Sequence, residues 1–327
     1  MLKSTIPHNY EPKDFIEKSE GLVFAVVQHG TERSEEKDKV LCFLRYLKQV
    51  STNGDIWQKV NTDAANAYLA ANHPEYLHYS SFLAAHLHAV DINQIVQHHQ
   101  PRQRLQAILT SRQRDEVEQD LYDLCSLFQQ QGMDLLQIGV TGSLLIGAQR
   151  DSSDIDLVFY DRTLFHKARS ITAELILKDQ LADLDDNDWQ ESFARRSCAL
   201  SFAEYVRHER RKFNKGMING RKFDLSLVNE PQQSKPITYH KQGTIVIQAK
   251  VIGDQYGFDY PAVFEIEHDA ISRIVCFTAT YIGQAFVGEM VEVSGLLEQS
   301  EDDSQRIVVG SSREAPGEYI KVIQCPN

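Results

Sequence analysis

The sequence lacks several features that would assign it to a class of protein at once. No stretch approaches the roughly twenty apolar residues that a membrane-spanning helix needs. The chain up to about residue 30 has charges and prolines in place of a secretory signal pattern. The five cysteines are scattered and never form a Cys-x-x-Cys pair, so neither a disulfide framework nor a cysteine zinc site is expected. We expect a soluble cytoplasmic protein with no membrane partner.

The chain also lacks an excess of positive charge. Its formal net charge is −12 over 327 residues, which argues against a surface built for long nucleic acids. The charge is unevenly spread, because the segment from Arg195 to Lys222 contains nine lysines and arginines but two acidic residues. This basic segment either faces a phosphorylated ligand or is a solvated helix face.

Two aspartates separated by one residue, Asp154 and Asp156, are the most informative feature that is present. Residues 152 to 160 have the β-branched and aromatic side chains of a strand, in which every second residue faces the same way. The two carboxylates then share one face and repel each other, which a bound cation would relieve. Oxygen ligands favour Mg²⁺ or Mn²⁺. The other face receives the apolar side chains, which are Ile155, Leu157 and Phe159.

The pair Gly142-Ser143, upstream of the aspartates, predicts a phosphate site. Residues 135 to 141 are mostly apolar and indicate a buried strand, and residues 144 to 146 can begin a helix. A strand-to-helix turn directs backbone N–H groups and the helix dipole at an anion. Glycine admits a phosphate close to the backbone, and the serine hydroxyl adds a hydrogen bond. A triphosphate would therefore bind beside the metal.

These residues resemble the signature of the nucleotidyltransferase superfamily of DNA polymerase β. That signature is a hydrophobic residue, Gly-Ser, a spacer and Asp-hydrophobic-Asp-hydrophobic, and Val140 and Leu157 supply its outer positions. The family also needs a third carboxylate on a neighbouring downstream strand. Asp224 supplies it, in the alternating segment RKFDLSLV. The resemblance covers about residues 111 to 230.

The chain departs from the family pattern at one position. Small bacterial members usually have an arginine and a glycine after Gly-Ser, but Ile146 replaces the arginine here while Gly147 remains. The contacts that this arginine makes with the triphosphate must come from another residue here, or be absent. The basic segment offers candidates at spacings of four on one face of an expected helix, namely Arg207, Arg211 and Lys215.

The resemblance implies transfer of an NMP group from an NTP, ATP among them, to an acceptor hydroxyl, with release of pyrophosphate. Asp154 and Asp156 would hold two Mg²⁺ or Mn²⁺ ions, and Asp224 would complete the second site and accept the acceptor's proton. Gly142 and Ser143 would bind the β- and γ-phosphates. The acceptor is open: an RNA end, a protein hydroxyl, a small metabolite or an antibiotic each fits.

Other interpretations of the same residues remain. The nucleotidyltransferase core could be a platform that binds nucleotide or RNA without turnover. A sugar-transferring enzyme also uses Asp-x-Asp to hold Mn²⁺ and a nucleotide sugar, but it does not need the upstream Gly-Ser. The three aspartates could instead be exposed strand-end carboxylates paired with lysine or arginine. A scaffold that holds a partner protein on the acidic surface is a further interpretation.

The sequence predicts an α+β fold in which a polymerase-β-like core with a mixed sheet is flanked on both sides. A small β unit occupies residues 1–62, with strands over 22–27, 40–47 and 56–60 and a hairpin turn at Asn53-Gly54. A helical connector follows over 63–110. We expect its first helix to be capped by Asp63 and its second to span 81–99, closed by Pro101.

Histidines in the connector could bind metal or simply form hydrogen bonds, namely His86, His88, His98 and His99. The nucleotidyltransferase domain over 111–230 opens with a helix over 111–131, ended by Gly132. Further along, Asp188 and Glu191 resemble a capping box.

A polar segment with two prolines, over 229–236, is the expected linker to a C-terminal domain over 237–327. Five short alternating segments there predict a small β-barrel, OB-like in our interpretation. They cover 244–252, 262–267, 271–278, 289–297 and 306–309. Aromatic residues in this region either stack bases or pack the barrel, namely Tyr256, Phe258, Tyr260 and Tyr281.

Overall fold

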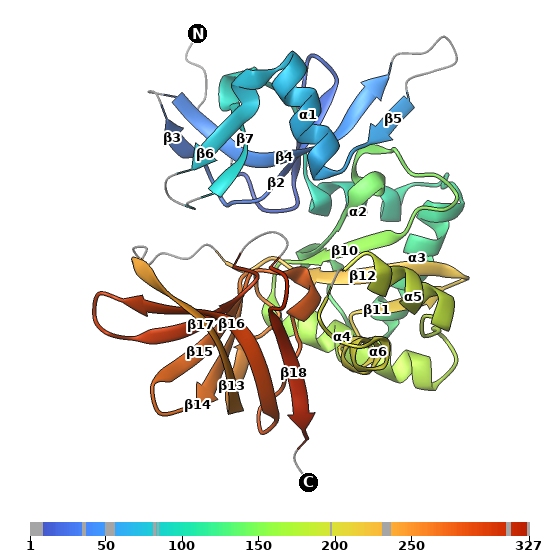
Figure 1. Cartoon of the computed structure of the whole chain (residues 1–327). Helices are drawn as coiled ribbons and strands as arrows, with labels where there is room; N and C mark the ends of the chain where they lie inside the picture. The colour runs from blue at the N-terminus through green and yellow to red at the C-terminus, as the bar shows by residue number, and fades with distance from the viewer. Residues whose placement is uncertain are drawn as a thin grey trace. The chain divides into compact units, whose positions relative to one another are not determined.

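The computed structural model describes residues 9–34, 37–49, 56–80, 83, 85–196, 198–230, 237–311 and 315–325. The fold is α+β, and the chain divides into two compact units, Met1–Tyr160 and Asp161–Asn327. Figure 1 labels the elements. The division falls within the expected 111–230 domain. Among the described residues, no helix is both long and apolar enough to cross a membrane.

An antiparallel sheet forms the first part of unit 1, with the strand order β6-β7-β4-β2-β1-β8. Two more strands, β3 and β5, pair with β4. The helix α1 (Thr62–Asn72) packs Ala65 and Leu69 into the core on one face of this sheet. The strands are β1 (Phe15–Lys18), β2 (Leu22–Val26), β3 (Glu32–Ser34), β4 (Lys37–Gln49), β5 (Ile56–Lys59), β6 (Leu77–Ser80), β7 (Ala85–Asp91) and β8 (Ile95–His99).

The expected strands over 22–27, 40–47 and 56–60 are present as β2, β4 and β5, and the first helix of the expected connector is present as α1. The second helix of the connector is wrong. The stretch expected as a helix over 81–99 forms β7 and β8, because pairing with β4 and β1 satisfies its backbone. Pro101 begins a helix instead of closing one, as its fixed φ favours the first helical turn. The N-cap of α1 is Asn61, not Asp63. The expected turn at Asn53-Gly54 lies outside the described residues.

The second part of unit 1 is a β-hairpin covered by helices. Here β10 (Ile155–Phe159) pairs antiparallel with β9 (Ile138–Thr141). Helix α2 (Pro101–Thr110) approaches β9 so closely that a Cβ on Gly139 would collide with Pro101. Helix α3 (Glu116–Gln130) starts later than expected, at the cap Asp115, and ends before Gly132 at positive φ as expected. Short 3₁₀ turns are η1 (Pro74–Tyr76), η2 (Ile92–Gln94), η3 (Leu135–Gln137) and η4 (Gly142–Ile146).

Unit 2 begins with three helices and a second hairpin. The helices are α4 (Arg162–Leu177), α5 (Asp186–Ala194) and α6 (Phe202–Arg210). The capping box of α5 uses Asp185 and Asp188, so the expected pairing of Asp188 with Glu191 is wrong. In the hairpin, β11 (Lys215–Ile218) pairs antiparallel with β12 (Arg221–Leu227).

The C-terminal strands of unit 2 close into a ring. The pairing order is β13-β14-β15-β17-β16, and β16 pairs back onto β13. All pairings in the ring are antiparallel except β15 with β17. The strands are β13 (Tyr239–Tyr256), β14 (Ala262–Glu267), β15 (Ile271–Cys276), β16 (Met290–Ser300) and β17 (Gln305–Val309), and the unexpected β18 (Tyr319–Gln324) adds to β16. A further turn is η5 (Ala279–Tyr281).

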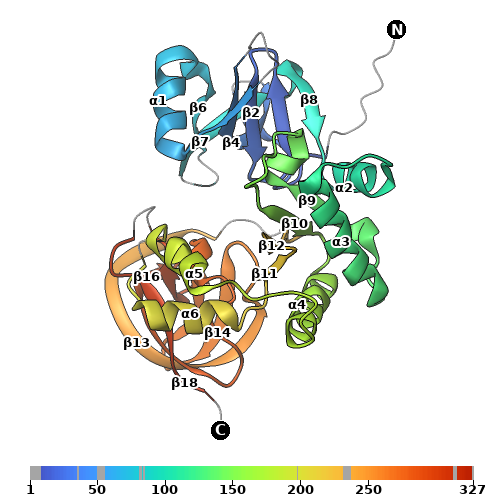
Figure 2. The same ribbon diagram turned by 90° about the vertical axis from the view of Figure 1, so that its right-hand side faces the viewer.

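The ring encloses a hydrophobic core that α5 and α6 share. Trp189 of α5 and Tyr205 of α6 belong to the same buried cluster as Val251, Phe264 and other barrel residues. Figure 2 shows the strands curving around this interior with the two helices against them. The barrel is therefore packed together with α5 and α6. Most of the expected linker, residues 231–236, lies outside the described residues.

Candidate functional site

The aspartate pair lies at the start of β10. Asp154 immediately precedes the strand and is exposed, whereas Asp156 lies on it, half-buried and opposite Thr141 of β9. Ile155, Leu157 and Phe159 are completely buried, as expected. The apolar side chains thus anchor the strand while both aspartates stay accessible.

Gly142 and Asp156 are in direct proximity. Gly142 has φ +69°, a left-handed conformation that disfavours side chains. A Cβ atom built at this position would clash with carboxylate oxygen Oδ2 of Asp156. The expected phosphate turn and the expected metal ligand therefore adjoin within unit 1, and only glycine fits between them.

The turn after Gly142 is shorter than expected. It is the five-residue 3₁₀ turn η4, ended by Gly147 in the left-handed region at φ +66°. The expected α-helix, and with it a helix-dipole anion site, is wrong. The turn is held in place from α2, because Arg104 donates from Nε to the carbonyl of Leu144 at 2.9 Å and also pairs with Glu118 at 2.7 Å.

The third carboxylate, Asp224, lies on β12 in unit 2. It is half-buried, between the buried side chains Phe223 and Leu225, so the expected alternation is confirmed. In the hairpin Asp224 stands opposite Lys215. Burial lowers the pKa of Lys215, but the carboxylates of Glu209 and Asp224 outweigh this and raise it overall. Lys215 is therefore a firmly charged cation beside Asp224.

The three expected phosphate-binding cations do not share a helix face. Helix α6 ends at Arg210, so Arg211 is its C-cap and Lys215 lies on β11. Each has a partner in unit 2: Arg207 donates to the carbonyl of Val322 at 2.6 Å, and Lys215 forms an ion pair with Glu209. Arg211 forms an ion pair with Glu289, a carboxylate that is 6 % exposed.

Three of the four histidines of the expected connector form hydrogen bonds with their neighbours, and His86 lies against the ring of Tyr79. His98 contacts Asp14 at 2.7 Å, and His99 contacts Glu17 at 3.1 Å. His88 is buried, and burial lowers its pKa to about 4. In the described part of the chain, no group of three or more His, Cys, Asp or Glu side chains is arranged to hold a metal ion.

The aromatic residues of the barrel region divide between the two expected roles. Phe258 and Tyr281 are buried and pack the core of unit 2. Tyr256 and Tyr260 are 43 % and 56 % exposed, and the guanidinium of Arg162 lies 4.7 Å from the ring centre of Tyr256. Stacking on a base is thus sterically open for these two rings only.

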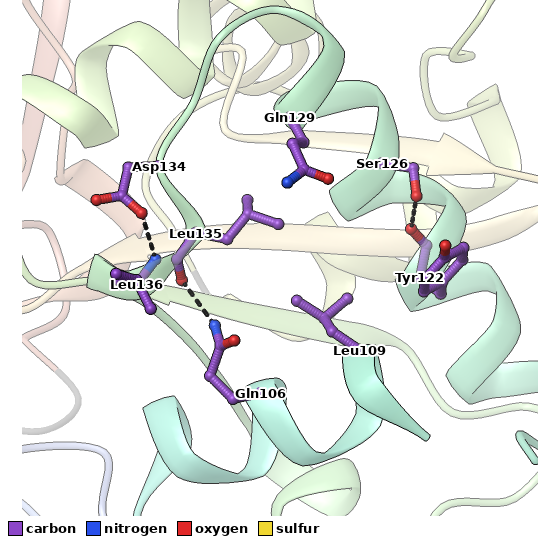
Figure 3. A pocket seen from close by; sticks show the side chains of 8 residues that line it. All are labelled: Gln106, Leu109, Tyr122, Ser126, Gln129, Asp134, Leu135 and Leu136. Carbon is purple, nitrogen blue, oxygen red and sulfur yellow. Dashed lines mark hydrogen bonds between the residues drawn. The ribbon is translucent and has the colours of Figure 1, made fainter. Parts of the chain in front are cut away.

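A pocket of about 300 Å³ lies between α2, α3 and η3 in unit 1 (Figure 3). Its polar groups bind one another or nearby backbone: Gln106 donates to the carbonyl of Leu135, and Asp134 accepts from the amide of Leu136. The η3 turn precedes β9, whereas Gly142 follows it. The pocket is therefore at the opposite end of β9 from the aspartate pair.

Sequence reasoning missed the proximity of the N-terminal sheet to the site. Leu145 of η4 belongs to a buried cluster with Phe15, Val23 and Tyr46, and Ile146 packs against it. No local signal marks this, since Tyr46 looks like any aromatic residue in a strand.

Together these features define a two-unit α+β protein with a glycine turn and a carboxylate pair at one hairpin. No family model and no solved structure matches the chain. A curated protein does: the uncharacterized protein MJ1086 of Methanocaldococcus jannaschii is 32% identical over 339 residues, covering 95% of this chain and 98% of that protein. The chain belongs to the family of this archaeal protein.

Proposed function

We propose that the protein is a metal-dependent nucleotidyltransferase of the cytoplasm, which moves an NMP group from an NTP to an acceptor hydroxyl and releases pyrophosphate. The observation that carries the proposal is the contact between Gly142 and the carboxylate of Asp156. It joins a turn that a phosphate can approach to a carboxylate that can hold the phosphate's counter-ion.

The donor set suits magnesium. Mg²⁺ in proteins is usually held by one or two carboxylates together with substrate phosphates. Asp154, which is exposed, and Asp156, which is half-buried, offer two such carboxylates. Bound there, Mg²⁺ or Mn²⁺ would neutralise charge on the triphosphate and activate the attacking hydroxyl. The amides of η4 and the hydroxyl of Ser143 would donate hydrogen bonds to phosphate oxygens.

Asp224 is the proposed third carboxylate, and its role would be to accept the proton of the acceptor hydroxyl. The support is its half-buried place on a rigid strand with Lys215 opposite. Arg207 and Arg211 would reach phosphate only by leaving their present partners.

The finer fold assignment belongs to the same proposal. We interpret the two hairpins with their helices as a polymerase-β-like core and the C-terminal ring as an OB-like barrel. Five strands closing into a mainly antiparallel ring support the latter. OB barrels often bind oligonucleotides, so a nucleic acid is the first acceptor to test. The fold alone does not decide which acceptor is used.

The test is pyrophosphate release from each of the four NTPs with Mg²⁺ or Mn²⁺, in the presence of RNA, protein and small hydroxyl acceptors. The variants are Asp154→Asn, Asp156→Asn and Asp224→Asn, which keep side-chain size and remove charge. We expect each to lower turnover at least about a hundred-fold. NTP binding without turnover in the wild type would favour the alternative, a nucleotide- or RNA-binding platform. No binding of metal or NTP would overturn both.

A further inference from the structure

A β-bulge in β4 brings two successive side chains to one face of the N-terminal sheet. Val23 of β2 pairs with Tyr46, but Phe24 pairs with Leu44, which leaves Arg45 as the extra residue. Leu44 packs into the core beneath α1, whereas Tyr46 packs into the cluster on the opposite face. Because successive side chains of a strand point to opposite faces, Arg45 points away from the face of Leu44. The bulge thus leaves Arg45 on the same face as Tyr46.

This face adjoins the candidate site. Tyr46 shares its buried cluster with Leu145 of η4, the turn that begins at Gly142. The Tyr46 hydroxyl is within electrostatic reach of both flanking charges: burial raises the pKa of Tyr46, Arg45 lowers it and Asp156 raises it. Arg45 and Asp156 therefore both lie near the same phenol group, in a single unit.

The bulge is held by a buried histidine. The regular pairing of β4 with β7 ends at Cys42 and His88. Beyond that point the amide of Leu44 donates to Nδ1 of His88 at 2.8 Å, and Nε2 of the same ring bonds to Asn66 at 2.8 Å. His88 is 1 % exposed, so this support is rigid. Arg45 is thus presented from a fixed backbone.

The same face is basic and aromatic. Lys59 stands opposite Tyr46, and Lys48 stands opposite Trp57, with its ammonium 5.5 Å from the ring centre. Within the described residues, Arg45 and Lys59 form no ion pair, in contrast to Arg211 and Lys215 of the basic segment. A polyanion that approached Gly142 and Asp156 would meet these charges.

We propose that Arg45 binds the polyphosphate of the donor nucleotide, in the role left open by Ile146, with Tyr46 positioning it beside Asp156. The inference rests on the proposed function. Arginine suits this role because its planar guanidinium forms two parallel hydrogen bonds with phosphate oxygens. The N-terminal sheet is then part of the nucleotide site.

The test is calorimetric titration of the full chain with ATP and with inorganic tripolyphosphate, each with Mg²⁺. We expect Arg45→Ala to weaken the binding of both ligands about ten-fold or more. Arg45→Lys should give an intermediate affinity, because lysine keeps the charge but lacks the paired N–H donors of the guanidinium. The matched control is Lys39→Ala, which removes a charge from the same strand roughly 20 Å away. It should bind like the wild type.

Two outcomes separate the proposals. If Asp156→Asn abolishes binding while Arg45→Ala binds like Lys39→Ala, the role of Arg45 is wrong and the proposed function stands. If neither ligand binds the wild type, the proposed function fails and the inference fails with it. Quenching of Trp57 in a Trp189→Phe background gives a second readout, because Trp189 is the chain's other tryptophan and is buried in unit 2.

Discussion

The carboxylate of Asp156 occupies the space in which a Cβ atom of residue 142 would stand. Gly142 achieves this approach in a left-handed conformation at the exact end of β9, where the antiparallel register sets Asp156 opposite Thr141. Two requirements thus coincide at one residue: positive φ and no side chain. The relationship ties the expected phosphate turn to the expected metal ligand through geometry rather than through sequence spacing.

Gly142→Ala should lower the free energy of unfolding and weaken Mn²⁺ binding. The left-handed conformation alone costs a side chain about 1–2 kcal/mol, and the Cβ must also displace Asp156. Gly147→Ala is the matched control, because Gly147 has a similar φ with open space around it. Gly147→Ala should lower the free energy of unfolding only by the cost of the left-handed conformation, and it should keep the wild-type affinity for Mn²⁺. Urea unfolding and Mn²⁺ titration measure both, and equal Mn²⁺ affinities of the two variants would contradict the steric argument.

Arg211→Ala should destabilise unit 2 by about 3–5 kcal/mol, since it leaves the buried carboxylate of Glu289 without its ion pair. Arg210→Ala provides the comparison: its pair with Asp183 is solvent-exposed, so a loss of about 1 kcal/mol or less is expected. Thermal or urea unfolding measures both. Similar small losses would show that Arg211 is free to serve a ligand, as its place in the basic segment first suggested.

Two buried histidines should make the protein sensitive to acid. Burial lowers the pKa of His88 and of His208 to about 4, and each ring accepts a backbone N–H, from Leu44 and from Val322. Between pH 6.5 and about 4 the unfolded chain binds more protons than the folded one. Each histidine's contribution to the free energy of unfolding is therefore fully present above pH 6.5. It is lost as the pH is lowered toward 4, which reduces the free energy of unfolding by up to about 3 kcal/mol per histidine.

NMR titration of the histidine ring protons checks this directly. The signals of His88 and His208 should stay unchanged from pH 7 to 5, because burial lowers the pKa of both rings to about 4. His88→Gln and His208→Gln should each flatten the pH dependence of urea unfolding over this window. A normal titration of either ring would contradict the assignment of a neutral, amide-accepting imidazole.

Elements with a strong local pattern were predictable. Strand β12 alternates apolar and polar residues after Lys222, and β10 begins the same way around Asp156, so burial of one face follows directly from the order of side chains. The strands in the stretch over 81–99 were not predictable, because short apolar runs with histidines are compatible with a helix and with a strand. Pairing with β4 and β1 decides between the two. Pro101 is compatible with either end of a helix for the same local reason.

The sequence by itself determined which chemical groups are available for the proposed chemistry: a glycine turn, an aspartate pair at the start of one strand and a further aspartate on another strand. The tertiary structure decided their surroundings. It set the carboxylate of Asp156 against Gly142, and it tied Arg211 to Glu289. It also made Arg45 the extra residue of a bulge in β4. The reason is physical: periodicity along the chain encodes which face is buried, but a contact depends on which distant segment covers that face.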